Sequence, residues 1–190
     1  IPHILTGADL VGVANTGTID SGAGSTVLAA GDLYSIAITQ DGRLAGRDVR
    51  LQGQGRGDVL VSGTIDASGE TGGRVEITGE RVGLTDSANI DASGSAGGGT
   101  VLVGGDYQGK NPAIRNATAS FVAPGATIRT DAYVNGNGGK VIVWGNEAAR
   151  VHGSIFARGG SASGDGGFIE TSGAFLDLAG INIDATAPAG

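Results

Sequence analysis

Short apolar stretches with alternating polar residues recur along the chain, and glycine-rich turns separate them. The segment Gly-Thr-Ile-Asp-Ala-Ser-Gly stands at residues 63–69, and variants of it return on both sides. The central apolar residues of these copies are Ile19, Leu44, Ile65, Ile90, Ile128, Ile155 and Ile183. A repeat of roughly 20 to 40 residues with a strand signal at its head indicates a solenoid, whose units bury their apolar sides against their neighbours.

One repeat shows the expected strands. Residues 64–66 form a first short strand, and a turn ending in Gly-Gly leads to residues 74–78, where Val75 and Ile77 alternate with polar residues. A third short strand is expected at residues 81–84. The pattern therefore predicts an all-β fold, a parallel β-helix with three short strands per coil and about 25 residues per coil.

The second strand of the repeat predicts which side chains face the interior. We expect stacked aliphatic columns formed by Val27, Val49, Leu51, Val75, Ile77, Val101, Val103, Val141, Val143 and Ile169. A register slip of one residue would turn such a set outward, so the columns should hold the coils in register.

The repeat organises the chain as one β-helix segment over residues 1–190. We expect a partial coil at 1–16, six to seven coils at 17–185 and a tail at 186–190. The chain contains no Met, which suggests a piece of a longer protein.

One repeat is longer than the others by about a dozen residues, and the excess at residues 106–119 predicts an insertion outside the helix. The outward positions beside it are unusually apolar, namely Leu102, Ile142 and Trp144. We expect the insertion to fold across them as a lid through Tyr107 and Ile114, because this would remove an exposed apolar patch.

Composition narrows the range of possible folds and functions further. Gly occurs 38 times and aromatic residues make up 4% of the chain, which favours many tight turns around a narrow aliphatic core. The formal net charge of −7 argues against a nucleic-acid partner, because phosphate binding needs a basic surface. There is no Cys, so disulfides and thiolate metal sites are excluded.

Two features are candidate binding sites. Arg56, Gly57 and Asp58 form the tripeptide that integrins bind, at an expected solvent-facing turn, and turn chemistry alone also explains it. The acidic residues Asp20, Asp66, Asp91 and Asp184 follow the central apolar residue of their repeats. They would form a column of solvated charges, with calcium as the alternative, although Ala45, Arg129 and Phe156 interrupt the column.

We expect no cofactor, catalytic residue or metal ion. Residues 104–110 match the start of a phosphate-binding loop, but Asn111 replaces the required Ser or Thr and no helix pattern follows. If the chain were an enzyme, a β-helical polysaccharide lyase or glycosidase would be the alternative. Asp91 with Arg129 is the best available beginning of its active site.

The repeated Gly-Thr-Ile-Asp-Ala-Ser-Gly copies and residues 101–111, 138–144 and 153–160 resemble the shaft repeats of filamentous haemagglutinin-type exoproteins of Gram-negative bacteria. These proteins are the cargo of two-partner secretion. The resemblance implies a right-handed parallel β-helix, export through an outer-membrane transporter, and a role in adhesion, aggregation or biofilm. It also implies a secreted protein at the bacterial cell surface.

The Asn-Pro-Asn-Leu and Asn-Pro-Asn-Gly motifs of that family's secretion domain do not occur here. We therefore expect a shaft segment downstream of the secretion domain. Its expected role is structural or adhesive, and its ends could pair with further copies into filaments, because unpaired strand edges invite pairing. Host cell or matrix surfaces are the other expected partners.

Overall fold

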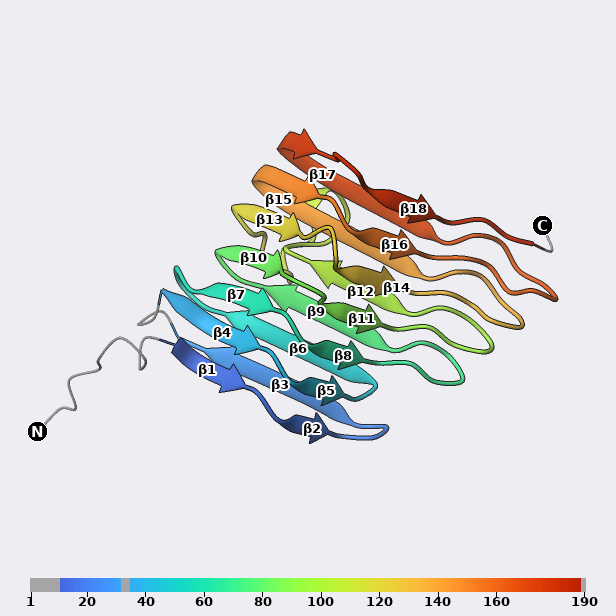
Figure 1. Cartoon of the computed structure of the whole chain (residues 1–190), viewed down its shortest axis with the longest axis horizontal. Helices are drawn as coiled ribbons and strands as arrows, with labels where there is room; N and C mark the ends of the chain where they lie inside the picture. Colours follow the sequence, from blue (N-terminus) through green and yellow to red (C-terminus); the bar gives the residue numbers. More distant parts are fainter. Residues whose placement is uncertain (1–10, 32–34, 189–190) are drawn as a thin grey trace, which may run out of the picture.

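The computed structural model describes residues 11–31 and 35–188, which wind into a parallel β-helix of about seven turns (Figure 1). Each turn contributes a strand to each of three faces, and all strand pairs between neighbouring turns are parallel. The parallel β-helix with three strands per coil that the repeat predicts is therefore confirmed.

The strands of the three faces alternate along the chain. The first face contains β3 (Ser25–Ala30), β6 (Asp48–Gly53), β9 (Arg74–Thr78), β12 (Thr100–Val103) and the beginnings of β15 (Lys140–Val151) and β17 (Phe168–Asp177). The second face contains β1 (Val11–Asn15), β4 (Ile36–Gln40), β7 (Asp58–Val61), β10 (Arg81–Leu84), β13 (Ala119–Val122) and the ends of β15 and β17. The third contains β2 (Thr18–Asp20), β5 (Arg43–Ala45), β8 (Thr64–Asp66), β11 (Asn89–Asp91), β14 (Thr127–Arg129), β16 (Ser154–Phe156) and β18 (Asn182–Asp184).

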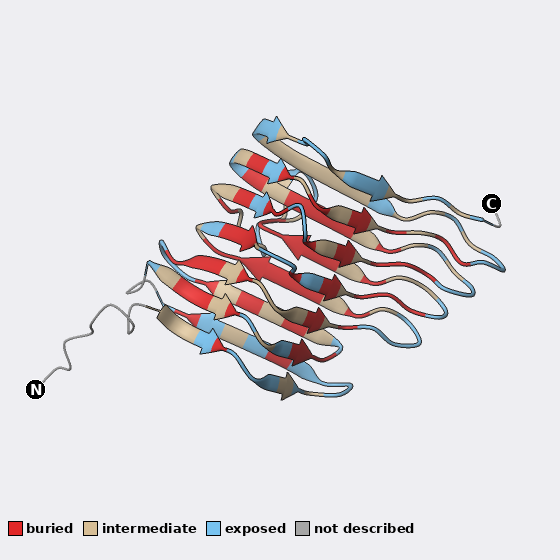
Figure 2. Cartoon of the chain, in the orientation of Figure 1, coloured by how far each residue is buried: buried red, intermediate tan, exposed pale blue. Residues whose placement is uncertain are grey.

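The repeated isoleucines form one column inside the third face. Backbone pairing places Ile19, Leu44, Ile65, Ile90, Ile128, Ile155 and Ile183 in direct register, as expected. The five middle members are fully buried, whereas Ile183 in the last coil is 45% exposed. Figure 2 shows the same gradient, with buried residues concentrated in the middle coils. Each inner member is covered because the coils above and below supply its neighbours.

The first face also stacks its aliphatic residues, but the sequence placed one of them wrongly. Val49, Val75, Val101 and Val141 form one column. In the lowest coil, Thr26 pairs with Val49 and is buried, while Val27 pairs with Arg50 and is 53% exposed. The expected inward position of Val27 is therefore incorrect, because β3 already begins at Ser25 and shifts the alternation by one residue.

Polar side chains occupy part of the interior near the N-terminal coils. Gln40 is fully buried, and its side-chain oxygen accepts a hydrogen bond of 2.8 Å from the Asn15 amide. The Gln40 amide donates to the Thr64 carbonyl at 3.5 Å. A buried amide is costly unless it is paired, so these contacts between successive coils make the polar pair tolerable.

The two C-terminal coils depart from the expected short strands. β15 and β17 run from the first face onto the second without a break, and their pairing shifts register between Gly145 and Ala148. A bulge of this kind bends a strand, so one long strand can turn the corner that other coils turn with a loop.

Glycine pairs before the first-face strands permit the coils to approach closely. A Cβ atom on Gly99 would overlap the carbonyl oxygen of Gly73 in the coil below, and one on Gly73 would overlap that of Arg47. Only a residue without a side chain fits, which explains why Gly-Gly recurs at this corner.

The expected partial coil at residues 1–16 is represented by β1, while residues 1–10 lie outside the described part of the chain. In the described part, no helix has the length and apolar character needed to cross a membrane.

We predict that Ile77→Ala lowers the free energy of unfolding by about 2–5 kcal/mol, because it removes buried methyl groups and leaves a cavity. Ile77 is fully buried. Val27→Ala is the matched control on the outer surface and should change stability by less than about 0.5 kcal/mol. Chemical denaturation followed by circular dichroism measures both, and equal losses would contradict the register described above.

Candidate functional site

A strap of residues 104–118 leaves the helix between β12 and β13 and includes the short 3₁₀ helix η2 (Tyr107–Gly109). The strap closes where it began, because the Ala117 amide donates to the Gly104 carbonyl at 2.7 Å. Ala119, expected at the end of the insertion, already belongs to β13. The strap is therefore an excursion that returns to the same corner.

The strap covers the apolar outer surface of the first face. Leu102 and Ile142 point outward from their strands, yet both are fully buried. A Cβ atom on Gly109 would lie 2.6 Å from the Trp144 indole, so the strap backbone rests directly on that ring. The expected lid is confirmed over Trp144. The role expected for Tyr107 is wrong, since the residue is 46% exposed and its ring meets that of Phe168 edge-on, with 5.6 Å between the ring centres.

Polar anchors tie the strap to several coils. Lys140 Nζ lies 2.7 Å from Asp106 Oδ1, and the backbone amide of Gln108 donates to the Glu170 carboxylate. At the other end, Arg115 donates to the carbonyl oxygens of Gly53 and Gly55 and to the Glu80 carboxylate. The strap thus bridges coils from β6 to β17.

The environment of Asp106 makes one anchor sensitive to acid. Burial by itself raises the pKa of Asp106, but hydrogen bonds from Asn111, Lys140 and the Tyr107 amide outweigh it and lower the pKa to about 2. All three bonds stabilise the ionised form.

The tripeptide Arg56, Gly57 and Asp58 lies at the corner between β6 and β7. Arg56 is exposed, whereas Asp58 is 8% exposed and accepts hydrogen bonds from Arg81 Nε at 3.0 Å and from Arg81 Nη2. Gly57 is buried against Ala37. The expected solvent-facing turn is therefore wrong for Gly57 and Asp58, because neighbouring coils cover them. Binding through the tripeptide stays a prediction, and the ion pair favours a structural role for Asp58.

The acidic column is present, and the structure assigns its members a local role. Asp20, Asp66, Asp91 and Asp184 occupy equivalent third-face positions. Each carboxylate accepts the amide hydrogen of the residue two positions later, at 2.7 to 3.0 Å. This is the Asx turn that Asp commonly makes at a strand end. The spacing of Asp and a following Ser, Thr or Gly is the sequence signal for it.

The Asx turn of the last coil also lowers the pKa of its carboxylate. The pKa of Asp184 is lowered mainly by the hydrogen bond from the Thr186 backbone amide and, to a smaller extent, by that from the Thr186 hydroxyl. Within residues 11–31 and 35–188, no group of three or more His, Cys, Asp or Glu side chains is arranged to hold a metal ion.

Asp91 and Arg129, the residues considered for polysaccharide cleavage, are neighbours in the third face. Their functional groups have other partners. Arg129 lies 3.1 Å from Asp131 and stacks 4.5 Å from the centre of the Phe156 ring, while Asp91 accepts the Ser93 amide. This arrangement resembles a structural charge network, in which Asp131 also binds Arg158 at 2.7 Å.

We predict that Asp58→Asn destabilises the protein by about 1–2 kcal/mol, because it weakens a charged hydrogen bond to Arg81 at a mostly buried acceptor. Thermal denaturation measures the change. Arg56→Ala, in the same tripeptide but exposed, is the control and should leave the melting temperature nearly unchanged. A loss of cell attachment in Asp58→Asn without any loss of stability would contradict the structural role.

We predict that the strap loosens as the pH falls toward 2. The unfolded pKa of Asp is about 3.9. Because the pKa of Asp106 is lowered to about 2 in the folded state, its stabilisation is complete above pH 4 and is lost as the pH falls through 2. Trp144 is the single tryptophan of the chain, so its fluorescence reports the change.

Asp106→Asn should shift the Trp144 emission to longer wavelength already at pH 7, since the strap loses an anchor. Asp86→Asn is a suitable control because Asp86 is exposed in a left-handed turn that Asn also adopts. An emission spectrum in Asp106→Asn identical to that of the unaltered protein would show that this anchor does not hold the strap.

The chain is similar to a protein of known structure. No family model and no curated protein sequence matches the chain. Among solved structures, the chain is similar to the crystal structure of the HMW1 secretion domain from Haemophilus influenzae, with a TM-score of 0.77 and 31% sequence identity. The match covers 92% of this chain and 48% of that one, so the chain spans about half the length of this relative.

The matched protein is itself described as a secretion domain, whereas the sequence led us to expect a shaft downstream of one. The match extends over almost the entire chain. The chain is a parallel β-helix similar to a bacterial secretion domain.

Proposed function

We propose that this chain is the β-helical body of a protein exported by two-partner secretion, where it acts as a stiff structural element. The observation that carries the proposal is the similarity to the HMW1 secretion domain over 92% of the chain. An outer-membrane transporter is the corresponding export partner, and the extracellular surface of a Gram-negative bacterium is the corresponding location.

The interior supports a mechanical role. Successive coils share backbone ladders on three faces, and the columns between them are fully buried from Leu44 to Ile155. Bending such a rod would break parallel hydrogen bonds and open the dry interior at the same time. A stiff spacer that presents its corners to the surroundings follows from this construction.

Assembly end to end is part of the same proposal. The last described coil leaves Leu176 and Ile183 41% and 45% exposed, although their counterparts in lower coils are buried. β17 and β18 are also edge strands in the described part of the chain. Unpaired strand edges bind further strands readily, so a second copy stacked on this coil would continue both columns.

Adhesion would then depend on what the corners and outer faces bind. Host cell or matrix surfaces are the proposed targets, and the parallel coils would serve to place such sites at a distance from the bacterium.

Electron microscopy of the purified protein tests the structural function. We expect rods whose length increases with protein concentration. Ile183→Lys should keep them short, because it places a charge at the exposed end of the column. Val134→Lys is the matched control, since Val134 is 46% exposed on a corner loop, and this variant should still assemble.

Single short particles at every concentration would refute the assembly. Cleavage of acidic polysaccharides that is lost in Arg129→Ala would refute the structural function in favour of an enzyme.

A further inference from the structure

The corners that lead into the first face differ greatly in length. The corner of the second coil consists of residues 46–47, whereas the corners of the following coils comprise residues 67–73, 92–99, 130–139 and 157–167. Figure 1 shows these loops projecting farther from the helix toward the C-terminus. The second coil therefore leaves a notch between the corner of the first coil, residues 21–24, and the first of the long loops.

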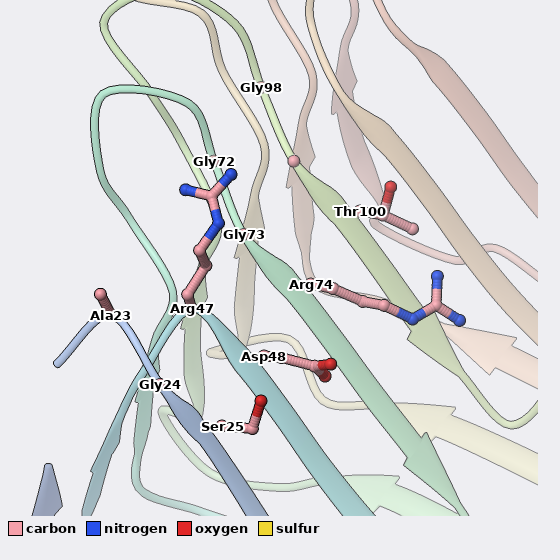
Figure 3. Close-up of a pocket in the computed structure, with 11 residues that line it drawn as sticks. Ala23, Gly24, Ser25, Arg47, Asp48, Gly72, Gly73, Arg74, Gly98 and Thr100 are labelled. Carbon is pink, nitrogen blue, oxygen red and sulfur yellow. The ribbon is translucent and has the colours of Figure 1, made fainter. Parts of the chain in front are cut away.

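Arg47 stands in this notch and borders two recesses. The larger recess has a volume of about 420 Å³ and lies on the first-face side, while a second of about 370 Å³ lies on the third-face side. Figure 3 shows the Arg47 side chain extending toward Gly72 and Gly73, with Asp48 and Arg74 on the adjoining strands. The larger recess therefore has one guanidinium group at its edge and a second on the next coil.

The guanidinium of Arg47 differs from its neighbours because its charge is not neutralised locally. Arg43, Arg50 and Arg74 each form an ion pair with a carboxylate, at 2.6, 2.7 and 3.0 Å. Arg47 is exposed and forms no ion pair with any residue in the described part of the chain. Its donors are therefore free for a ligand.

The remaining groups around the larger recess are small and polar. Asp48 also lines it, but its two carboxylate oxygens are held by Arg50 at 3.1 and 2.7 Å. Ser25 and Thr100 add hydroxyl groups, and the rest of the lining is Ala23 and glycines. Glycine edges let a sugar ring approach the backbone closely, while the scarcity of apolar side chains disfavours an apolar peptide.

The second recess contains carboxylates beside Arg47. Asp20 and Asp66 line it, and Asp66 is paired with Arg43. An anionic group would therefore enter the larger recess, while hydroxyl-bearing parts of the same ligand could extend past Arg47 toward the smaller one.

We propose that the notch binds a carboxylate-bearing sugar unit of an acidic polysaccharide. The planar guanidinium of Arg47 matches a carboxylate through two parallel hydrogen bonds. Arg74 is held by Glu76, so Arg47 supplies the charge, and the hydroxyl groups of Ser25 and Thr100 bind sugar hydroxyls. The site is open, so each unit binds weakly, and a polymer binds through several rods at once. No bond in the sugar is broken.

Titration of the full chain with oligogalacturonate, followed by calorimetry, tests the proposal. Arg47→Gln should weaken binding by about ten-fold or more, as expected for the loss of a charged hydrogen-bonded pair. Arg150→Gln is the matched control, because it removes the same charge from an exposed position on the second face, outside the notch. It should retain the affinity of the unaltered protein, and circular dichroism of both variants checks that they fold.

Two further probes separate specific from general attraction. Arg47→Lys keeps the charge but loses the paired donors, so it should bind oligogalacturonate less well than the unaltered protein. Dextran sulfate offers sulfate in place of carboxylate and should bind more weakly at the notch. Equal losses in Arg47→Gln and Arg150→Gln, absence of saturable binding, or binding of dextran sulfate alone would overturn the proposal. None of these results bears on whether microscopy finds the rods of the proposed function.

Discussion

Parallel backbone pairing between successive coils is the constraint on which the rest of the structure depends. Each strand of a middle coil is paired with the strand above and the strand below, in register, on all three faces. Since the side chains alternate along a strand, this register places equivalent residues of every coil on top of one another. The interior can then be filled by the same kind of aliphatic side chain in every coil, as in the column from Leu44 to Ile155.

The same constraint leaves variation to the corners and outer faces. A corner can be two residues long or eleven without disturbing the ladders, as residues 46–47 and 157–167 show. The strap at residues 104–118 leaves the helix at a corner, returns to it, and uses Gly105 and Gly109 to rest on Trp144. Features that could recognise a ligand, including the notch around Arg47, are consequences of these differences in corner length.

In the described part of the chain, charged residues lie at the corners and on the outer faces, where most of them have a structural partner. Much of the acidic surface is used locally, because the column that includes Asp66 and Asp91 caps its own turns. Pairs such as Asp58 with Arg81 connect one coil to the next. The net negative charge of the whole sequence therefore does not predict the local charge of each site, and a basic recess can occur on an acidic protein.

The sequence by itself determined the repeat, the three-strand coil and most of the interior. Ile65 and Val75 could be assigned inward because apolar periodicity and glycine spacing are local signals that recur in every coil. Val27 was misassigned because the alternation there is compatible with two registers, and only pairing with Arg50 decides between them.

For the charged outward groups, only the tertiary structure decided which are buried and which are free. Asp58 and Arg47 both follow a glycine at a corner. The carboxylate of Asp58 is nevertheless covered by Arg81, whereas the guanidinium of Arg47 is open to solvent in the notch. The reason is that burial of an outward side chain depends on the lengths of corners and on insertions one or more coils away. Contacts between residues so distant in the chain leave no periodic trace in the sequence.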